Sequence, residues 1–173
     1  MKLRSLEGLA TRPTADRVKE GMFSAIQFEI EGRKVLDLFA GTGQLGIECL
    51  SRGASHAVFV DAAKESVQVI RENLQKTGLN QTSTLLQSDA IAYLDRCREK
   101  FDLIFLDPPY QSGQLSAALK KISEIDILSG SGIIICEYAM GQEPAVPAGL
   151  TLSRSYRYGK TGVALLRPEK DTK

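Results

Sequence analysis

The sequence predicts an α/β fold: a three-layer α/β/α sandwich with a mostly parallel seven-stranded sheet and an antiparallel C-terminal strand. Strand-like and helix-like segments alternate along most of the chain and are joined by short loops, which is typical of parallel sheets covered on both faces. The last two strand-like segments are separated by Gly159 and Lys160, which indicates an antiparallel hairpin. Two observations, alternation and a terminal hairpin, therefore define the expected fold class.

Each expected element has a local signal. Thr14 stands where a helix N-cap would, and Val18, Met22 and Ile26 follow at four-residue spacing. Gly78 is placed to end a helix that starts at Lys64. The expected helices are residues 14–28, a segment ending near 50, 64–77, 89–97 and 114–122. The expected strands are residues 34–39, 56–61, 82–87, 102–106, 132–137, 150–158 and 162–167.

Length and composition favour a single domain over residues 1–173. The chain has 173 residues, of which 43% are hydrophobic and 25% charged, which is ordinary for a globular protein with a proper core. Residues 1–28 are expected to form a basic segment and a helix, and residues 33–167 the core. No apolar run approaches the roughly 20 residues that span a bilayer, so a cytoplasmic location is expected. The chain is also expected to act as a monomer.

Cysteine and histidine patterns point to neither a disulfide framework nor a metal site. Cys49, Cys97 and Cys136 are far apart, and His56 is the single histidine. Charge is uneven: residues 1–19 carry a net +3 and residues 152–173 a net +4, around a middle of −6. Two basic ends could contact a polyanion such as a nucleic acid.

A glycine-rich turn follows the first strand and indicates a nucleoside cofactor. Gly41 and Gly43 lie at the first strand-to-helix junction, where ligands of open α/β sheets bind, and they allow close approach of the backbone. Asp61 ends the next strand twenty residues after Gly41, where a carboxylate can accept both ribose hydroxyls. With Gly46, this pattern also satisfies the dinucleotide-binding fingerprint, so a nicotinamide or flavin enzyme is a competing interpretation.

Asp37 favours one of these cofactors. A carboxylate inside the strand, just before the glycines, would be poorly placed near a pyrophosphate but suits a cofactor with an ammonium group. S-adenosylmethionine has that ammonium and no phosphate. Asp89 ends the third strand and could either cap the following helix or reach the adenine amine; its position on the same sheet edge favours the second role.

The fourth strand ends in Asp107-Pro108-Pro109-Tyr110, a rigid and extended stretch. The exocyclic amine of a nucleobase is a weak nucleophile, and methyl transfer to it requires acceptors for its two N–H bonds. Asp107 and the Pro108 carbonyl can supply these acceptors, and Tyr110 can stack on the base. A base within a duplex cannot be reached, so the target would be flipped out or single-stranded.

These segments resemble a known family. LDLFAGTGQLGIECLSRGA, FVD and FDLIFLDPPY resemble class I S-adenosylmethionine-dependent methyltransferases, which have a Rossmann-like fold. Together with RPTADRVKEGMF, they closely resemble the bacterial 16S ribosomal RNA (guanine(966)-N2)-methyltransferases of the RsmD type. The resemblance runs from about Leu3 to Arg167. It implies methylation of a guanine N2 amine in 16S rRNA, within the small ribosomal subunit or an assembly intermediate.

The resemblance also implies roles for individual residues. Those expected to bind S-adenosylmethionine are Asp37, Phe39, Gly41, Gly43, Asp61, Ala62, Asp89 and Ala90. Those expected to hold the guanine are Asp107, Pro108, Pro109 and Tyr110. Arg12, Thr14 and Arg17 match the family's amino-terminal motif, where an arginine could meet the cofactor carboxylate or RNA phosphate; a helix cap and solvated charges are the alternative.

Two features depart from the family pattern. Family members usually begin with a further short basic segment, whereas this sequence starts at MKLRSLEG, and Ala62 stands where a larger polar residue often follows the acid. Two other functions stay open from the residues: a DNA adenine or cytosine amino-methyltransferase, and a non-catalytic RNA-binding assembly factor. The absence of an obvious target-recognition domain argues against the first, and the intact Asp107–Tyr110 motif argues against the second.

Overall fold

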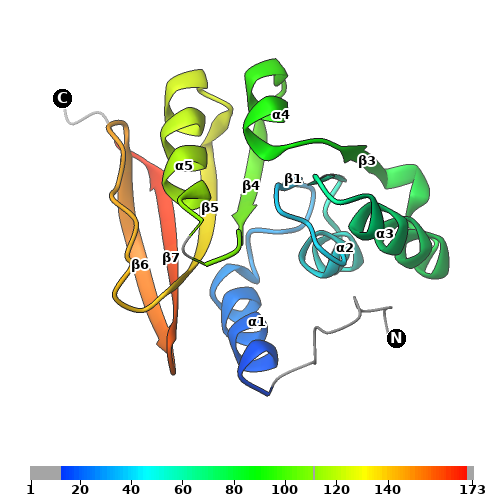
Figure 1. Ribbon diagram of the computed structural model, residues 1–173, viewed down its shortest axis with the longest axis horizontal. Helices are drawn as coiled ribbons and strands as arrows, with labels where there is room; N and C mark the ends of the chain where they lie inside the picture. The colour runs from blue at the N-terminus through cyan, green and yellow to red at the C-terminus, as the bar shows by residue number, and fades with distance from the viewer. Residues whose placement is uncertain (1–12, 111, 171–173) are drawn as a thin grey trace.

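The computed structural model describes residues 13–110 and 112–170, with side chains from residue 15 onward. Seven strands form one sheet in the order β3-β2-β1-β4-β5-β7-β6 (Figure 1). The strands are β1 (Lys34–Asp37), β2 (His56–Asp61), β3 (Ser83–Gln87), β4 (Phe101–Leu106), β5 (Leu128–Ala139), β6 (Leu150–Tyr158) and β7 (Thr161–Pro168). Strands β1 to β5 are parallel, whereas β7 runs antiparallel to β5 and to β6. The mostly parallel sheet with an antiparallel C-terminal strand is confirmed.

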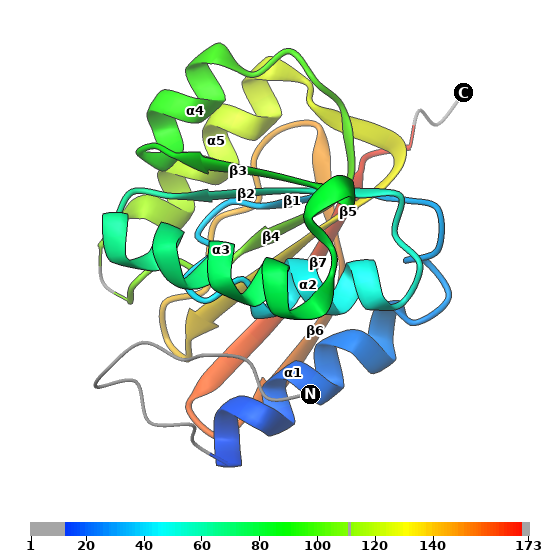
Figure 2. The ribbon, with the colours of Figure 1, turned by 90° about the vertical axis from the view of Figure 1, so that its right-hand side faces the viewer.

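Helices cover both faces of the sheet, as expected for a three-layer sandwich. They are α1 (Pro13–Ile26), α2 (Gln44–Ser51), α3 (Lys64–Thr77), α4 (Ala90–Arg96) and α5 (Gln114–Ile125), with a short 3₁₀ turn at Asn80–Thr82. Figure 2 shows α4 and α5 above the sheet and α1, α2 and α3 below it. Within the part of the chain described, no helix is both long enough and apolar enough to cross a membrane.

Several element bounds differ from those expected. Helix α1 begins at Pro13, so Thr14 lies inside the first turn rather than at the N-cap; proline suits this position because its φ is already helical. Thr82 belongs to the 3₁₀ turn rather than to β3, and β5 extends on both sides of residues 132–137 because β4 and β7 pair with it. These differences change the ends of helices and strands, but the order of the expected elements is unchanged.

Alternate side chains of the central strands build two cores. Val35, Phe59 and Phe105 pack beneath α1, α2 and α3, whereas Leu36 and Ile104 face α4 and α5. All five are buried. Burial on both faces explains why these strands read as nearly continuous apolar runs.

Helix α2 packs unusually close to the sheet at Gly46. A Cβ added to Gly46 would lie 2.4 Å from the ring of Phe59, which is fully buried. A residue without a side chain is therefore needed there. The close packing holds the N-terminus of α2 over the carboxyl ends of β1 and β2, where the candidate site lies.

Candidate active site

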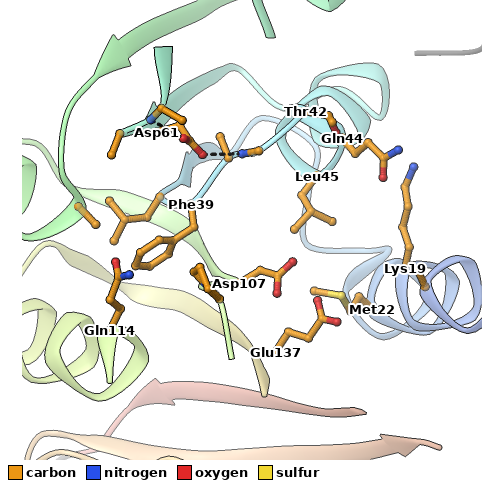
Figure 3. Close-up of a pocket in the computed structure, with 18 of the residues that line it drawn as sticks. Lys19, Met22, Phe39, Thr42, Gln44, Leu45, Asp61, Asp107, Gln114 and Glu137 are labelled. Carbon is orange, nitrogen blue, oxygen red and sulfur yellow. Dashed lines mark hydrogen bonds between the residues drawn. The ribbon is translucent and has the colours of Figure 1, made fainter. Parts of the chain in front are cut away.

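A large pocket lies at the carboxyl ends of the central strands, where the strand order reverses between β1 and β4. Its volume is about 640 Å³, within the range of roughly 300–1,000 Å³ that is usual for small-molecule sites. We call it the main pocket. Figure 3 shows that it is bounded by the turn after β1, the end of β2, the end of β4, Glu137 of β5 and helix α1.

The turn after β1 is held in place by Asp61. The backbone N–H of Gly41 donates to Asp61 Oδ2 at 2.9 Å, and that of Ala63 donates to Oδ1 at 2.9 Å. Gly41 has a φ of 59° and lines the pocket with Phe39. Each oxygen of the Asp61 carboxylate has a further lone pair for a ligand hydroxyl, so its two backbone hydrogen bonds are compatible with the expected ribose contact.

Gly43 and Asp37 lie beneath the pocket rather than on its surface. Gly43 precedes α2 with a φ of 83°, and a side chain there would press on Ile70 and Ile47. Asp37 is 2% exposed, and its Oδ2 accepts a hydrogen bond from the backbone N–H of Gly46 at 3.1 Å. The structure thus shows packing and positioning roles for both residues, and their expected contact with the cofactor stays a prediction.

Burial raises the pKa of Asp37 to about 7, against the lowering effect of the Gly46 hydrogen bond; the charge of Asp61 raises it further. Asp37 therefore changes charge near neutral pH, directly below the turn. A cation bound in the main pocket would favour its ionised form.

Asp89 caps a helix and also lines the main pocket, whereas the contact with the adenine amine that the sequence favoured stays a prediction. Its Oδ2 caps α4 by accepting the backbone N–H of Ala92 at 3.0 Å, and the residue also lines the main pocket beside Ala90. Ala62, after β2, lines the pocket as well. The loops after β1, β2 and β3 thus meet at one edge, as predicted.

The Asp107–Tyr110 stretch separates the main pocket from a smaller neighbour. Asp107 and Pro109 line the main pocket, whereas Pro108, Pro109 and Tyr110 line a second pocket of about 140 Å³. Pro109 and Glu137 line both pockets. A cofactor in the main pocket and a base in the second pocket would meet at these residues.

Asp107 and Glu137 form a pair of facing carboxyl groups. Figure 3 shows both side chains directed into the same part of the main pocket. Asp107 is open to the pocket but otherwise surrounded by protein, and this burial raises its pKa well above the ordinary value; the charge of Glu137 raises it further. Burial also raises the pKa of Glu137, although hydrogen bonds from Asp107 and Tyr110 oppose this. Both shifts favour a proton shared between the two carboxyl groups.

Tyr110 is held from the other side. Its hydroxyl lies 3.5 Å from Glu137 Oε1 and 3.3 Å from Thr161 Oγ1 of β7. The side chain is half exposed, at 49%. A ring fixed at its hydroxyl end and open on its surface is suited to stacking on a base.

Two charged residues of the site were not singled out from the sequence. Glu137 ends a buried run, Ile133–Cys136, and that strand-end position was the signal that could have found it. Lys19 lies in α1, and Figure 3 shows its side chain extending beside Gln44. Lys19 follows Ala15 by one helical turn, and both line the pocket. The sequence could not predict this, because it does not show which face of α1 packs toward the site.

The amino-terminal motif residues are placed only in part. Arg17 lies in α1 with an exposed side chain and is not among the residues lining the main pocket. Arg12 and the side chain of Thr14 lie outside the described residues. Their expected contacts with cofactor or RNA therefore stay predictions.

The charge of the main pocket separates the two cofactor interpretations. Asp61, Asp89, Asp107 and Glu137 place four carboxyl groups on its wall, and among the described lining residues Lys19 alone is basic. Such a wall suits a ligand with cationic groups and hydroxyl donors, whereas it would repel a pyrophosphate. The residues fit S-adenosylmethionine better than a dinucleotide. Among the described residues, no cluster of His, Cys, Asp or Glu is suited to hold a metal ion.

The strand order, the glycine turn and the acidic pocket define a class I S-adenosylmethionine-dependent methyltransferase. The family described as Conserved hypothetical protein 95 matches residues 1–167, and the chain belongs to this family. Its relatives bear the names expected from the resemblance to the RsmD type, which is thereby confirmed.

Three relatives illustrate the similarity. The chain is 39% identical over 169 residues to "Putative rRNA methyltransferase YlbH" of Bacillus subtilis, covering 95% of this chain and 92% of that protein. It is 32% identical over 162 residues to "Ribosomal RNA small subunit methyltransferase D" of Haemophilus influenzae, covering 91% and 83%. The solved structure of "Putative methyltransferase yhhF" from Escherichia coli superimposes with a TM-score of 0.87 at 30% identity, covering 98% and 92%.

Proposed function

We propose that this protein transfers a methyl group from S-adenosylmethionine to the exocyclic N2 amine of a guanine in 16S rRNA, the guanine at position 966 in the family's naming. The observation that carries the proposal is the rigid Asp107–Tyr110 stretch between the acidic main pocket and the second pocket. The names of the relatives, which specify rRNA and the small subunit, support the substrate class.

The residues of the site have distinct tasks in this reaction. When bound, S-adenosylmethionine would supply a methyl group on a positively charged sulfur, and the C–S bond electrons would stay with that sulfur as the amine nitrogen bonds to the methyl carbon. Asp107 and the Pro108 carbonyl accept the two N–H groups and so aim the nitrogen lone pair. Because the amine becomes cationic as it reacts, the Asp107 carboxylate stabilises the transition state. It then receives the proton that the amine loses.

The rest of the site positions and shields the reacting groups. Tyr110 stacks on the base, and Pro109 holds the distance between Asp107 and Tyr110. The main pocket binds the cofactor through Asp61 and the Gly41 turn, with Asp89 and Ala90 toward the adenine. A target held in a duplex would have to be flipped out to reach Asp107.

We further propose that the chain acts as a monomer of one domain on a small-subunit particle or assembly intermediate. A small domain with a net charge of +1 has little capacity to bind naked RNA by charge alone. Recognition of a folded ribosomal surface, by shape and splayed bases, suits it better.

The test is transfer of labelled methyl groups from S-adenosylmethionine to small ribosomal subunits, naked 16S RNA and duplex DNA, followed by nucleoside analysis. We expect N2-methylguanosine from the subunit or its precursor. Label in DNA would instead support a DNA amino-methyltransferase. No label in any substrate, despite cofactor binding, would support a non-catalytic assembly factor.

A further inference from the structure

Glu137 lies where the two pockets meet. Together with Pro109, it lines both the main pocket and the second pocket. It is half-buried at the end of β5, in the sheet between β4 and β7. A base that reaches from the second pocket toward the cofactor must pass this side chain.

The register of the sheet sets Glu137 beside Asp107. Strands β4 and β5 are parallel with Leu106 opposite Cys136, so Asp107, which follows β4, and Glu137, within β5, lie at the same level. The Tyr110 hydroxyl engages Glu137 Oε1, while Tyr110 also contacts Thr161 on the far side. The remaining lone pairs of the Glu137 carboxylate are available to a donor from a base.

Two facing carboxyl groups are stabilised by a hydrogen between them. When one is protonated, Asp107 and Glu137 hydrogen-bond to each other. When both are ionised, they repel each other unless donors from a ligand lie between them. The site therefore favours a base edge that presents several adjacent N–H groups.

Among the bases with an exocyclic amine, guanine has such an edge. Its N2 amine is adjacent to a ring N1–H, so N1–H and one amine N–H point in the same direction while the second amine N–H points toward the N3 side. In adenine and cytosine, the ring nitrogen beside the amine is an acceptor, whose lone pair would face a carboxylate. Two carboxylates and one carbonyl match the three hydrogens of guanine.

Resting on the proposed function, we propose that Glu137 selects guanine: its carboxylate accepts the N1–H of the target base, while Asp107 and the Pro108 carbonyl accept the N–H groups of the amine. Glu137 is thus a specificity-determining residue beside the Asp107–Tyr110 stretch. Glu137 neither forms nor breaks a bond to carbon in the methyl transfer.

The experiment exchanges the hydrogen-bond donor and acceptor at the proposed contact between Glu137 and N1 of the target base. 2-Aminopurine carries the same amine as guanine, but its N1 is an acceptor without a hydrogen. Small subunits are reconstituted with guanine or 2-aminopurine at the nucleotide that the wild-type protein methylates, and transfer rates are compared for wild type and Glu137→Gln. In the variant, Oε1 can still meet Tyr110, and the amide NH₂ can donate to N1 of 2-aminopurine.

We expect wild type to prefer guanine over 2-aminopurine by about 10- to 100-fold, the range of one good pair of base contacts. Glu137→Gln should erase or reverse that preference when transfer is measured at saturating S-adenosylmethionine, so that any change in cofactor affinity does not enter the comparison. Glu137→Asp, which keeps the acceptor, should still prefer guanine. Glu143→Gln, an acid-to-amide change in the loop after β5, serves as the matched control.

The outcomes are separable. If Glu137→Gln slows transfer to both bases equally and leaves the preference intact, Glu137 has only a structural role and the assignment is wrong. If the wild-type protein transfers no methyl group to a guanine amine in any substrate, the proposed function fails, and this assignment falls with it.

Discussion

Asp107 and Asp61 line the same pocket, but replacing each with alanine should affect different steps: methyl transfer for Asp107 and cofactor binding for Asp61. Asp107→Ala removes an acceptor for the reacting amine, so we expect transfer to fall by about 100-fold or more while the dissociation constant for S-adenosylmethionine changes by no more than about threefold. Asp61→Ala should chiefly weaken binding of S-adenosylmethionine, because it also releases the backbone N–H of Gly41. Calorimetric titration with the cofactor and single-turnover transfer measure the two effects. Activity of Asp107→Ala within a few-fold of wild type would remove Asp107 from the mechanism.

Asp37 links the stability of the fold to pH. Its pKa is about 7 in the folded protein and near 3.8 when unfolded. The folded state therefore keeps a proton that the unfolded chain has released, so this residue makes the free energy of unfolding fall as pH rises from about 4 to 7. Above pH 7, the Asp37 contribution is constant.

Asp37→Asn should lack this dependence, since an amide oxygen can still accept the N–H of Gly46. Between pH 5 and pH 8, we expect the difference in the free energy of unfolding to shift in favour of the variant by roughly 1–3 kcal/mol. Urea unfolding at both pH values measures the difference. A difference that is the same at pH 5 and pH 8 would contradict the raised pKa.

At the scale of elements, the contact between α2 and β2 holds the glycine turn in place. Gly46→Ala would force its Cβ against the buried ring of Phe59, at 2.4 Å without relaxation. We expect a loss of roughly 1–3 kcal/mol in the free energy of unfolding, partly offset by the better helix propensity of alanine. Because α2 would shift, cofactor binding should weaken as well.

Gly130→Ala is the matched control, because no atom beyond the two chain neighbours lies within 4 Å of the added Cβ. It should change stability by less than about 0.5 kcal/mol. Urea unfolding of both variants makes the comparison. Equal stability of Gly46→Ala and wild type would show that α2 is free to move away from the sheet.

At the scale of the whole molecule, basic side chains follow one edge of the sheet toward the active site. Arg154, Arg157 and Lys160 are exposed on β6 and the turn after it. Thr161, next in the chain, contacts Tyr110. This edge is therefore continuous with the position proposed for the target base, and RNA phosphates are the partner that its charge fits.

Replacing Arg154 and Arg157 with alanine should weaken binding to small subunits and lower the slope of log affinity against log salt concentration by about 1 to 2. The control is alanine at Lys64 and Lys76, which are exposed on α3 beside the opposite edge strand. Affinity measured over a series of salt concentrations gives the slopes. Equal slopes for the two double variants would argue that β6 does not contact phosphates.

Local patterns were sufficient for most of the architecture. Gly78 ends α3 in the left-handed conformation that the sequence predicts, and the apolar run 102–106 forms a central strand. These features depend on backbone preferences and side-chain period, which act over a few residues. The stretch Asp107–Tyr110 likewise depends on local preferences, because its two prolines predict a rigid strand end.

The sequence by itself determined the α/β class, the glycine turn, the strand-end acids Asp61, Asp89 and Asp107, and the resemblance to one methyltransferase family. Only the tertiary structure decided that Asp37 lies beneath the pocket and that Glu137 faces Asp107. The reason is that strand order and register join residues far apart in the chain: β5 lies beside β4 with Leu106 opposite Cys136, thirty positions later. That pairing depends on how the helices pack on both faces of the sheet, which no local pattern contains.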